Sequence, residues 1–260
     1  MLKTPMDNAP FEITLGETFQ HLSNPPIVEA VIHWQARAQK PFEEIGWKSA
    51  LTEKLPEYRS CEPMHRFEAM MTLEGDGPKF ESQQGLDGLR LTSDDKLQIV
   101  QFKRDGVVFS RLHPYQDWEQ FSNAALKTWR AFVEIAEPVE IHRLGVRFIN
   151  RIASAKPDGL KPVLREPPTC PANLPLIDFV YQSTFAVPDQ PFAIRVIKLM
   201  QPSVPNSPEG SGLFLDCDVY TTKPLPCEEQ EMINTLAAMR RLKNSIFFSL
   251  LTTETLKNFE

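Results

Sequence analysis

Two segments that read as strands carry charges at positions where a buried strand would carry none. The first, residues 24–32, holds Glu29 among apolar neighbours, and the second, residues 143–151, holds Arg147 and Arg151. A buried carboxylate or guanidinium costs free energy unless it finds a partner, and each segment can supply the partner that the other needs. We therefore predict that Glu29 pairs with an arginine of the second segment, Arg147 being the favoured one.

The composition is that of an ordinary globular protein. The chain has 260 residues, of which 42% are hydrophobic and 24% charged, so it can bury a sizeable core. A formal net charge of −6 argues against broad non-specific binding to nucleic acid or anionic membrane, although it leaves room for a local basic patch. No apolar stretch approaches the roughly 20 residues of a membrane-spanning helix, and no apolar run follows Lys3 as a secretory signal requires. The four cysteines stand far apart, which indicates reduced thiols and argues against zinc. We expect a cytoplasmic protein.

Strand patterns outnumber helix patterns along the chain. Helical spacing of apolar residues predicts helices over about 41–56, from Pro114 to Pro138, and over about 227–243, with an apolar run at 246–251 that extends or follows the last one. The first helix is expected to bury Phe42, Ile45, Leu51 and Leu55. Strands are expected at 27–37, 65–73, 88–91, 97–104, 107–113, 139–153, 178–187, 192–200 and 213–221. Asp105-Gly106 between two alternating runs is the strongest hairpin signal.

Runs of consecutive strands between isolated helices predict the α+β class. We expect a large, curved, mostly antiparallel sheet with about three long helices packed on one face. The prediction is a single domain over residues 1–260, with a polar lead-in at 1–23 and proline-rich loops at 154–175 and 201–212.

One face of the arginine-bearing strand offers a candidate anion site. Alternation places Arg143, Arg147 and Arg151 on the same face, and Gly145 between the first two leaves room for a ligand to approach the strand. The planar guanidinium binds carboxylate or phosphate through two parallel hydrogen bonds. The alternative is that these arginines pair with acids on adjacent strands and face solvent, as the polar side of an antiparallel sheet commonly does.

Two acidic positions are candidates for the opposite charge or for a metal. Asp216 and Asp218 alternate with apolar residues and share one strand face, where their oxygens can bind a divalent cation. They can equally pair across strands with Arg143, Arg147 or Arg195. No third acid at convincing spacing completes a metal site.

Glu29 and His33 also share a strand face, which makes them a weak acid–base candidate beside the structural pairing of Glu29 with arginine. The sequence contains no phosphate-binding P-loop, no Gly-x-Gly-x-x-Gly that opens a helix and no Gly-x-Ser-x-Gly nucleophile elbow. We therefore expect no cofactor.

Residues 25–30, Pro-Pro-Ile-Val-Glu-Ala, and residues 144–151, Leu-Gly-Val-Arg-Phe-Ile-Asn-Arg, carry a family resemblance. The chain resembles a sporadically distributed family of prokaryotic conserved hypothetical proteins, from Pro25 to the apolar segment 246–252. The resemblance implies a single-unit cytoplasmic protein of similar length and a gene of the accessory or defence type. It transfers no catalytic residue.

Two functional classes follow from these patterns. The favoured one is a binding or interaction protein, leaning away from catalysis, in which a groove with arginines holds an anionic small molecule or an acidic protein partner, with His33 and Glu29 as further candidates. The alternative is a metal-assisted hydrolase that uses Asp216, Asp218 and Glu29. A homo-oligomer is compatible with either class.

Overall fold

The computed structural model describes residues 18–260, except 75–76, 154–158, 170, 172–173 and 202–209, and it describes residues 67–84 without their side chains. Most of the predicted lead-in and parts of both proline-rich loops therefore lie outside the described residues.

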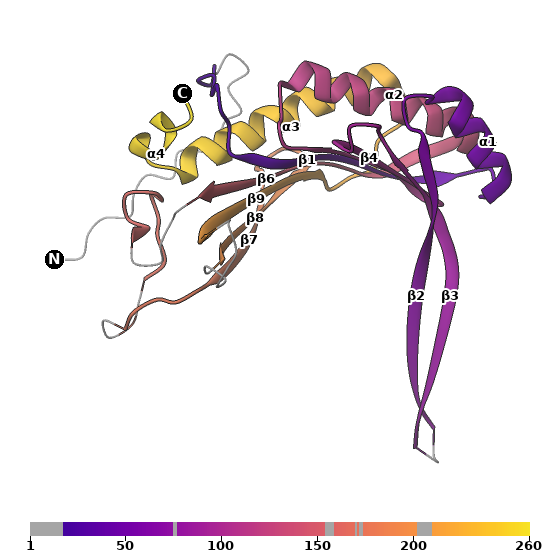
Figure 1. Cartoon of the computed structure of the whole chain (residues 1–260), viewed down its shortest axis with the longest axis horizontal. Helices are drawn as coiled ribbons and strands as arrows, with labels where there is room; N and C mark the ends of the chain where they lie inside the picture. Colours follow the sequence, from indigo (N-terminus) through magenta and orange to yellow (C-terminus); the bar gives the residue numbers. More distant parts are fainter. Residues whose placement is uncertain (1–17, 75–76, 154–158, 170, 172–173, 202–209) are drawn as a thin grey trace. The chain divides into compact units, whose positions relative to one another are not determined.

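The described residues form an α+β structure, which confirms the predicted class and the antiparallel sheet (Figure 1). The strands are β1 Ile27–Ala38, β2 Ser60–Glu74, β3 Gly77–Thr92, β4 Gln98–Lys103, β5 Gly106–Leu112, β6 Pro138–Ala153, β7 Val180–Ala186, β8 Phe192–Gln201 and β9 Gly212–Thr221. The helices are α1 Glu44–Lys54, α2 Trp118–Ala136, α3 Glu229–Leu250 and the short α4 Thr253–Lys257. The nine strands follow the order β2-β3-β4-β5-β1-β6-β9-β8-β7.

The chain packs into two compact units, and two of the strands contribute to both. The first unit contains residues 1–28, 146–223 and 229–260, and the second contains 29–145 and 224–228. The boundary falls inside β1 and inside β6. The single-domain description of residues 1–260 stays a prediction, and each unit is described by itself.

In the second unit, α2 covers the sheet with an aromatic core. Trp129 stacks on Trp34 of β1 at 5.5 Å between ring centroids and on Phe132 at 5.6 Å. Asp117 caps the start of the helix: its carboxylate accepts a hydrogen bond from the backbone N–H of Gln120 at 2.8 Å and so satisfies one of the free donors of the first turn. One face of this helix, with Phe121, Ala125, Trp129, Phe132 and Ala136, is buried against the strands, as the helical spacing of these apolar residues predicts.

Helix α1 buries Leu51 as predicted, and the predicted Leu55, directly after the helix, is buried too. Trp47 and Leu51 lie one turn apart and are buried, and Trp47 packs edge-on against Phe132. Ile45, expected in the core, is 86% exposed. In an 11-residue helix, the large indole of Trp47 fixes which side turns inward, and Ile45 lies off that side.

The β4–β5 hairpin confirms the Asp105-Gly106 signal. Gly106 has φ of +149°, and a Cβ atom there would lie 1.9 Å from the carbonyl oxygen of Trp34. Only glycine fits this close approach of two strands.

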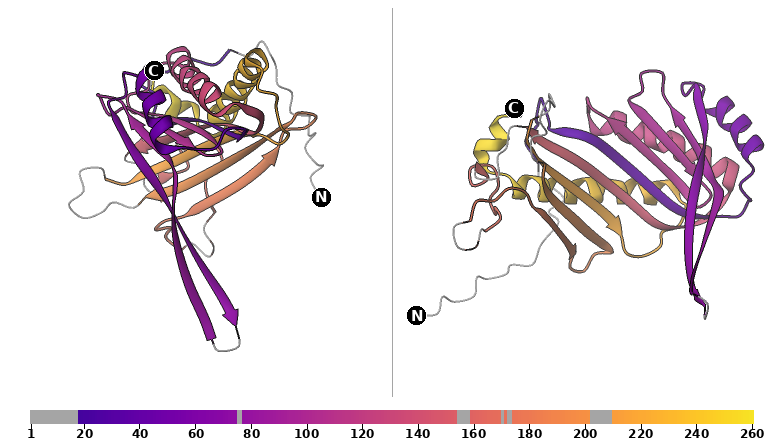
Figure 2. Two further views of the ribbon diagram at one scale, coloured as in Figure 1. Left: turned by 90° about the vertical axis from the view of Figure 1, so that its right-hand side faces the viewer. Right: turned by 60° about the horizontal axis from the view of Figure 1, so that its bottom comes forward.

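Strands β2 and β3 form a ribbon that is much longer than predicted. All of Gly77–Thr92 pairs with Ser60–Glu74, whereas β4 pairs only with residues 88–92 of β3. The ribbon beyond that point has two strands and extends away from the helices of its unit (Figures 1 and 2). The sequence missed residues 77–87 because their glycines, glutamines and acids have low strand propensity, and pairing with β2 outweighs that preference.

In the first unit, α3 packs on β9 (Figure 2), and the buried core includes side chains of both, of β6 and β8, and of residues 160–164. The buried cluster contains Ile152, Leu160, Leu164, Phe179, Met200, Leu213, Leu215, Phe247, Leu251 and Leu256. The apolar run at 246–251 therefore continues the predicted last helix, which ends at Leu250. Strands β9, β8 and β7 follow one another in antiparallel register. No helix among the described residues has the length and apolar character to cross a bilayer.

Candidate functional site

Arg147 pairs with Asp216 rather than standing open. The Nε atom of Arg147 donates to Oδ1 of Asp216 at 2.8 Å, and Nη2 donates to Oδ2 at 2.5 Å. The Asp216 side chain is only 11% exposed, whereas that of Arg147 is 45% exposed. Alternation puts Arg147 of β6 and Asp216 of β9 on one face of neighbouring strands, so this pair realises the alternative that adjacent strands supply the acids.

Because it is paired with Arg147, Asp216 is not a free carboxylate that a metal ion could bind. Both of its oxygens accept from the guanidinium, and Asp218 stands directly opposite Arg195 in the β8–β9 register. Within the described part of the chain, no group of three or more histidine, cysteine, aspartate or glutamate side chains is arranged to hold a metal ion. The metal-assisted hydrolase therefore gains no support from the placement of Asp216 and Asp218.

Arg143 fills the space that was expected to admit a ligand. Its guanidinium lies over Gly145, where an added Cβ atom would be 2.7 Å from Nη1. The same Nη1 atom is 3.4 Å from Nδ1 of His33. The prediction that Gly145 lets a ligand approach the strand is thus corrected: this glycine makes room for Arg143.

His33 is held in its neutral form. Burial, together with the positive charges of Arg143 and Lys103, lowers its pKa to about 4, and Asp105 acts in the opposite direction. A neutral imidazole beside a guanidinium accepts a hydrogen bond, so His33 serves Arg143 as a neighbour without adding charge. This placement gives no support to a Glu29–His33 acid–base pair.

Arg151 is also engaged within its own unit. Its Nη2 atom donates to the carbonyl oxygen of Gly210 at 3.3 Å, and its guanidinium lies over Gly212 of β9, 3.0 Å from where a Cβ atom would stand. Arg143 belongs to one unit, and Arg147 and Arg151 belong to the other. All three arginines thus have intramolecular neighbours, and their role as an anion site stays a prediction.

Glu29 is half-buried and stands opposite Leu112 in the β1–β5 register. Its pairing with an arginine of residues 143–151 also stays a prediction. The guanidinium of Arg147, the favoured partner, has Asp216 as its bidentate carboxylate.

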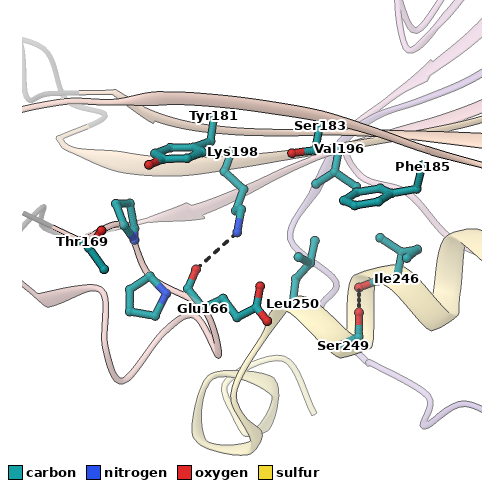
Figure 3. A pocket seen from close by; sticks show the side chains of 12 residues that line it. Glu166, Thr169, Tyr181, Ser183, Phe185, Val196, Lys198, Ile246, Ser249 and Leu250 are labelled. Atoms are coloured by element: carbon teal, nitrogen blue, oxygen red, sulfur yellow. Dashed lines mark hydrogen bonds between the residues drawn. The ribbon is translucent and has the colours of Figure 1, made fainter. Parts of the chain in front are cut away.

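The first unit contains a groove of about 440 Å³ between α3 and the last two strands of the sheet order (Figure 3). We call it the α3–β8 groove, and its lining consists of Glu166, Pro167, Pro168, Thr169, Tyr181, Ser183, Phe185, Val196, Lys198, Ile246, Ser249 and Leu250. Strands form its roof, the last turns of α3 form one wall, and residues 166–169 form the other (Figure 3).

Strand register explains why these side chains converge. Tyr181 pairs with Lys198, Ser183 with Val196 and Phe185 with Ile194, so alternate residues of β7 and β8 point to the side that α3 covers. Pro167 and Pro168 stiffen the opposite wall. The predicted proline-rich excursion thus contributes one side of the groove through residues 166–169.

Lys198 is the cationic group in this groove. Its Nζ atom donates to the carbonyl oxygen of Glu166 at 3.2 Å, a bond drawn in Figure 3. Among the described residues, no carboxylate forms an ion pair with Lys198. Its side chain is half-buried, so the ammonium sits at an apolar surface with donor capacity to spare.

Apart from the exposed carboxylate of Glu166, the remaining groove groups divide into apolar walls and hydroxyls. Phe185, Val196, Ile246 and Leu250 offer apolar surface, and Ser249 already uses its hydroxyl to donate to the Ile246 carbonyl oxygen at 2.8 Å. Sequence reasoning missed this site entirely, because Lys198 looks like an ordinary polar position in a strand. The alternation of Tyr181, Ser183 and Phe185 was the available signal.

Two other hollows are less suited to a ligand. One of about 150 Å³ adjoins the start of α2, around Arg111, Tyr115 and Asp117. The other, of about 490 Å³, adjoins Val180, Leu199 and Phe214 and has no charged group except Asp178.

No family model matches the chain, and no curated protein matches it either.

Proposed function

We propose that this chain is a binding protein and that the α3–β8 groove takes an amphipathic ligand. The apolar body of the ligand lies against Phe185, Val196 and Ile246, and its anionic group meets Lys198. A volume of about 440 Å³ is within the range of small-molecule sites. The observation that carries the proposal is a lysine in an apolar groove whose partner is a single backbone carbonyl.

Lys198 is proposed in place of the arginines as the anion anchor. Asp216 occupies the guanidinium of Arg147, and Arg143 and Arg151 lie over glycines of their own units. An incoming anion would have to displace those contacts, whereas at Lys198 it would replace a hydrogen bond of 3.2 Å to an uncharged carbonyl oxygen with an ion pair.

The cellular setting belongs to the same proposal. We place the protein in the cytoplasm as an accessory or defence-type product of the prokaryotic family that residues 25–30 and 144–151 resemble.

The test uses two fluorescent probes that differ in charge. Anilinonaphthalene sulfonate has an apolar body and an anionic head, and N-phenylnaphthylamine has a similar body without the head. We expect Lys198→Met to weaken sulfonate binding roughly tenfold or more, because a charge-assisted hydrogen bond is worth about 1.5–3 kcal/mol. Binding of the neutral probe should not fall.

Lys161→Met is the matched control, since Lys161 is an exposed lysine of the same unit outside the groove. It should leave both affinities unchanged. Ser249→Trp places a large ring on the groove side of α3 and should block both probes. Equal sulfonate affinity in the wild type, Lys198→Met and Ser249→Trp would remove the groove as the binding site.

A further inference from the structure

Strand β7 is an edge strand without the protection that such strands usually carry. It ends the strand order, and among the described residues no strand pairs with its outer side. Its sequence, Val-Tyr-Gln-Ser-Thr-Phe-Ala, has neither charge nor proline. Strand β2, at the other end of the order, carries Glu62, Pro63 and Arg66. Natural sheets use such residues to prevent edge-to-edge pairing, so β7 is open to a partner strand.

The exposure of the β7 side chains also indicates that this strand is open to a partner strand. All seven residues are exposed, with Val180 at 68%, Tyr181 at 51% and Phe185 at 51%. Large exposed apolar side chains on a strand whose outer side is unpaired are the kind of surface that a second strand covers.

The pattern of β7 is symmetric about its middle residue. When two copies of this strand pair antiparallel about Ser183, Tyr181 stands opposite Phe185, Gln182 opposite Thr184 and Val180 opposite Ala186. Aromatic meets aromatic, polar meets polar and small meets small, and cross-strand pairs of these kinds are favourable. An antiparallel pairing of one strand with itself also closes by a twofold axis.

We propose that the protein forms a homodimer through antiparallel pairing of β7 with β7 of a second copy, with Ser183 on the twofold axis. The pairing joins two sheets edge to edge, and the same sheet face continues from one copy into the other. Because Tyr181, Ser183 and Phe185 line the α3–β8 groove, the two grooves become neighbours across the axis. The partner strand then closes the open side of each groove.

The position of Ser183 permits a charge-swap test. On the axis, each Ser183 faces its own symmetry mate, so Ser183→Lys or Ser183→Asp alone places like charges together. We expect the wild type to have the mass of a dimer in sedimentation at micromolar concentrations and each variant to be a monomer. An equimolar mixture of the two variants should restore the dimer, because Lys then faces Asp.

Gln230→Lys adds the same charge at an exposed position of α3 and should remain dimeric. Ser183→Cys should give an interchain disulfide on mild oxidation that neither Thr184→Cys nor the wild type gives to the same extent. Circular dichroism checks that each variant is folded.

A monomeric wild type would overturn the proposal, as would a mixture of Ser183→Lys and Ser183→Asp that stays monomeric. These results concern mass alone, so they are separable from the probe affinities that test the groove.

Discussion

Lys243 carries its charge in surroundings that disfavour it. It projects from α3, and its Nζ atom lies 3.8 Å from the centroid of the Phe148 ring. Burial lowers its pKa to about 7, Arg240 adds to the effect, and Cys217 opposes it. The residue keeps part of its surface exposed, and the ring favours the charged form through a cation–π contact, so only part of this shift should appear as stability.

Lys243→Met should therefore stabilise the protein, and it should do so most at low pH. Between pH 7 and 10.5 the unfolded chain holds a proton on Lys243 that the folded chain has lost, so wild-type stability rises with pH across this window. We expect the variant to gain about 1–2 kcal/mol in the free energy of unfolding at pH 6, discounted for exposure, and almost nothing near pH 10.

Urea unfolding over this pH range measures the difference. Lys223→Met, at an exposed lysine of the same unit, should show no such pH dependence. If Lys243→Met is less stable than the wild type at every pH, the ring of Phe148 compensates the charge fully.

At the scale of single residues, the sequence predicts on which strand face a side chain lies but not which residue it contacts. Alternation correctly put Arg147 and Asp216 on polar strand faces, and their pairing was one of the alternatives that it left open. Which acid reaches which arginine depends on β6 lying beside β9, and no local pattern encodes that order. Lys198 could not be recognised because its groove neighbours come from residues 166–169, β7 and α3, which are distant in the chain.

Among the helices and strands, α2 is capped at its N-terminus by one residue, Asp117. The carboxylate of Asp117 accepts from the Gln120 backbone N–H at 2.8 Å and from its side-chain amide at 2.7 Å. Asp117→Ala removes the acceptor and should cost about 1 kcal/mol in the free energy of unfolding.

Asp117→Asn keeps an acceptor oxygen and should retain most of that stability, losing only the favourable charge at the helix N-terminus. Thermal unfolding of the three proteins gives the comparison. Equal losses in the two variants would mean that the helix relies on the carboxylate charge and not on the cap.

Elements with strong periodicity were predictable, and those held by pairing were not. The apolar stripe of α2 and the Asp105-Gly106 turn were read correctly, because each depends on residues close in sequence. Most of β3 was missed because its order comes from its ladder with β2. In α1, Leu51 is buried as predicted, whereas Ile45 is exposed because the buried Trp47 decides which side of the helix turns inward.

The whole molecule divides its chain unevenly between the two units. One unit is almost continuous, residues 29–145 with a short return at 224–228, and the other assembles three separate pieces. The return contributes an isolated bridge between Ile141 and Leu225. The class of the fold could be predicted from strand runs, but this partition could not, because it depends on where β1 and β6 are shared.

A fragment of residues 29–145 should fold by itself, since it keeps α2, the aromatic core around Trp34 and Trp129, and four complete strands. A fragment of residues 146–223 should not, because without α3 the apolar face of β9 has no cover. We expect cooperative thermal unfolding by circular dichroism for the first fragment and none for the second.

Adding residues 224–260 to the second fragment should restore part of its order. A cooperative transition in the fragment 146–223 alone would contradict the importance given to α3.

The space that Gly145 leaves for the guanidinium of Arg143 also has a consequence for how these two positions can change in evolution. An alanine at position 145 would meet the far end of a flexible side chain and push the guanidinium away from His33, whereas loss of Arg143 would leave Gly145 with nothing to accommodate. It therefore matters which of the two residues is replaced first. Across the lineages that descend from a chain like this one, replacements of Gly145 should follow replacements of Arg143, and an ancestor with the arginine should have kept its glycine.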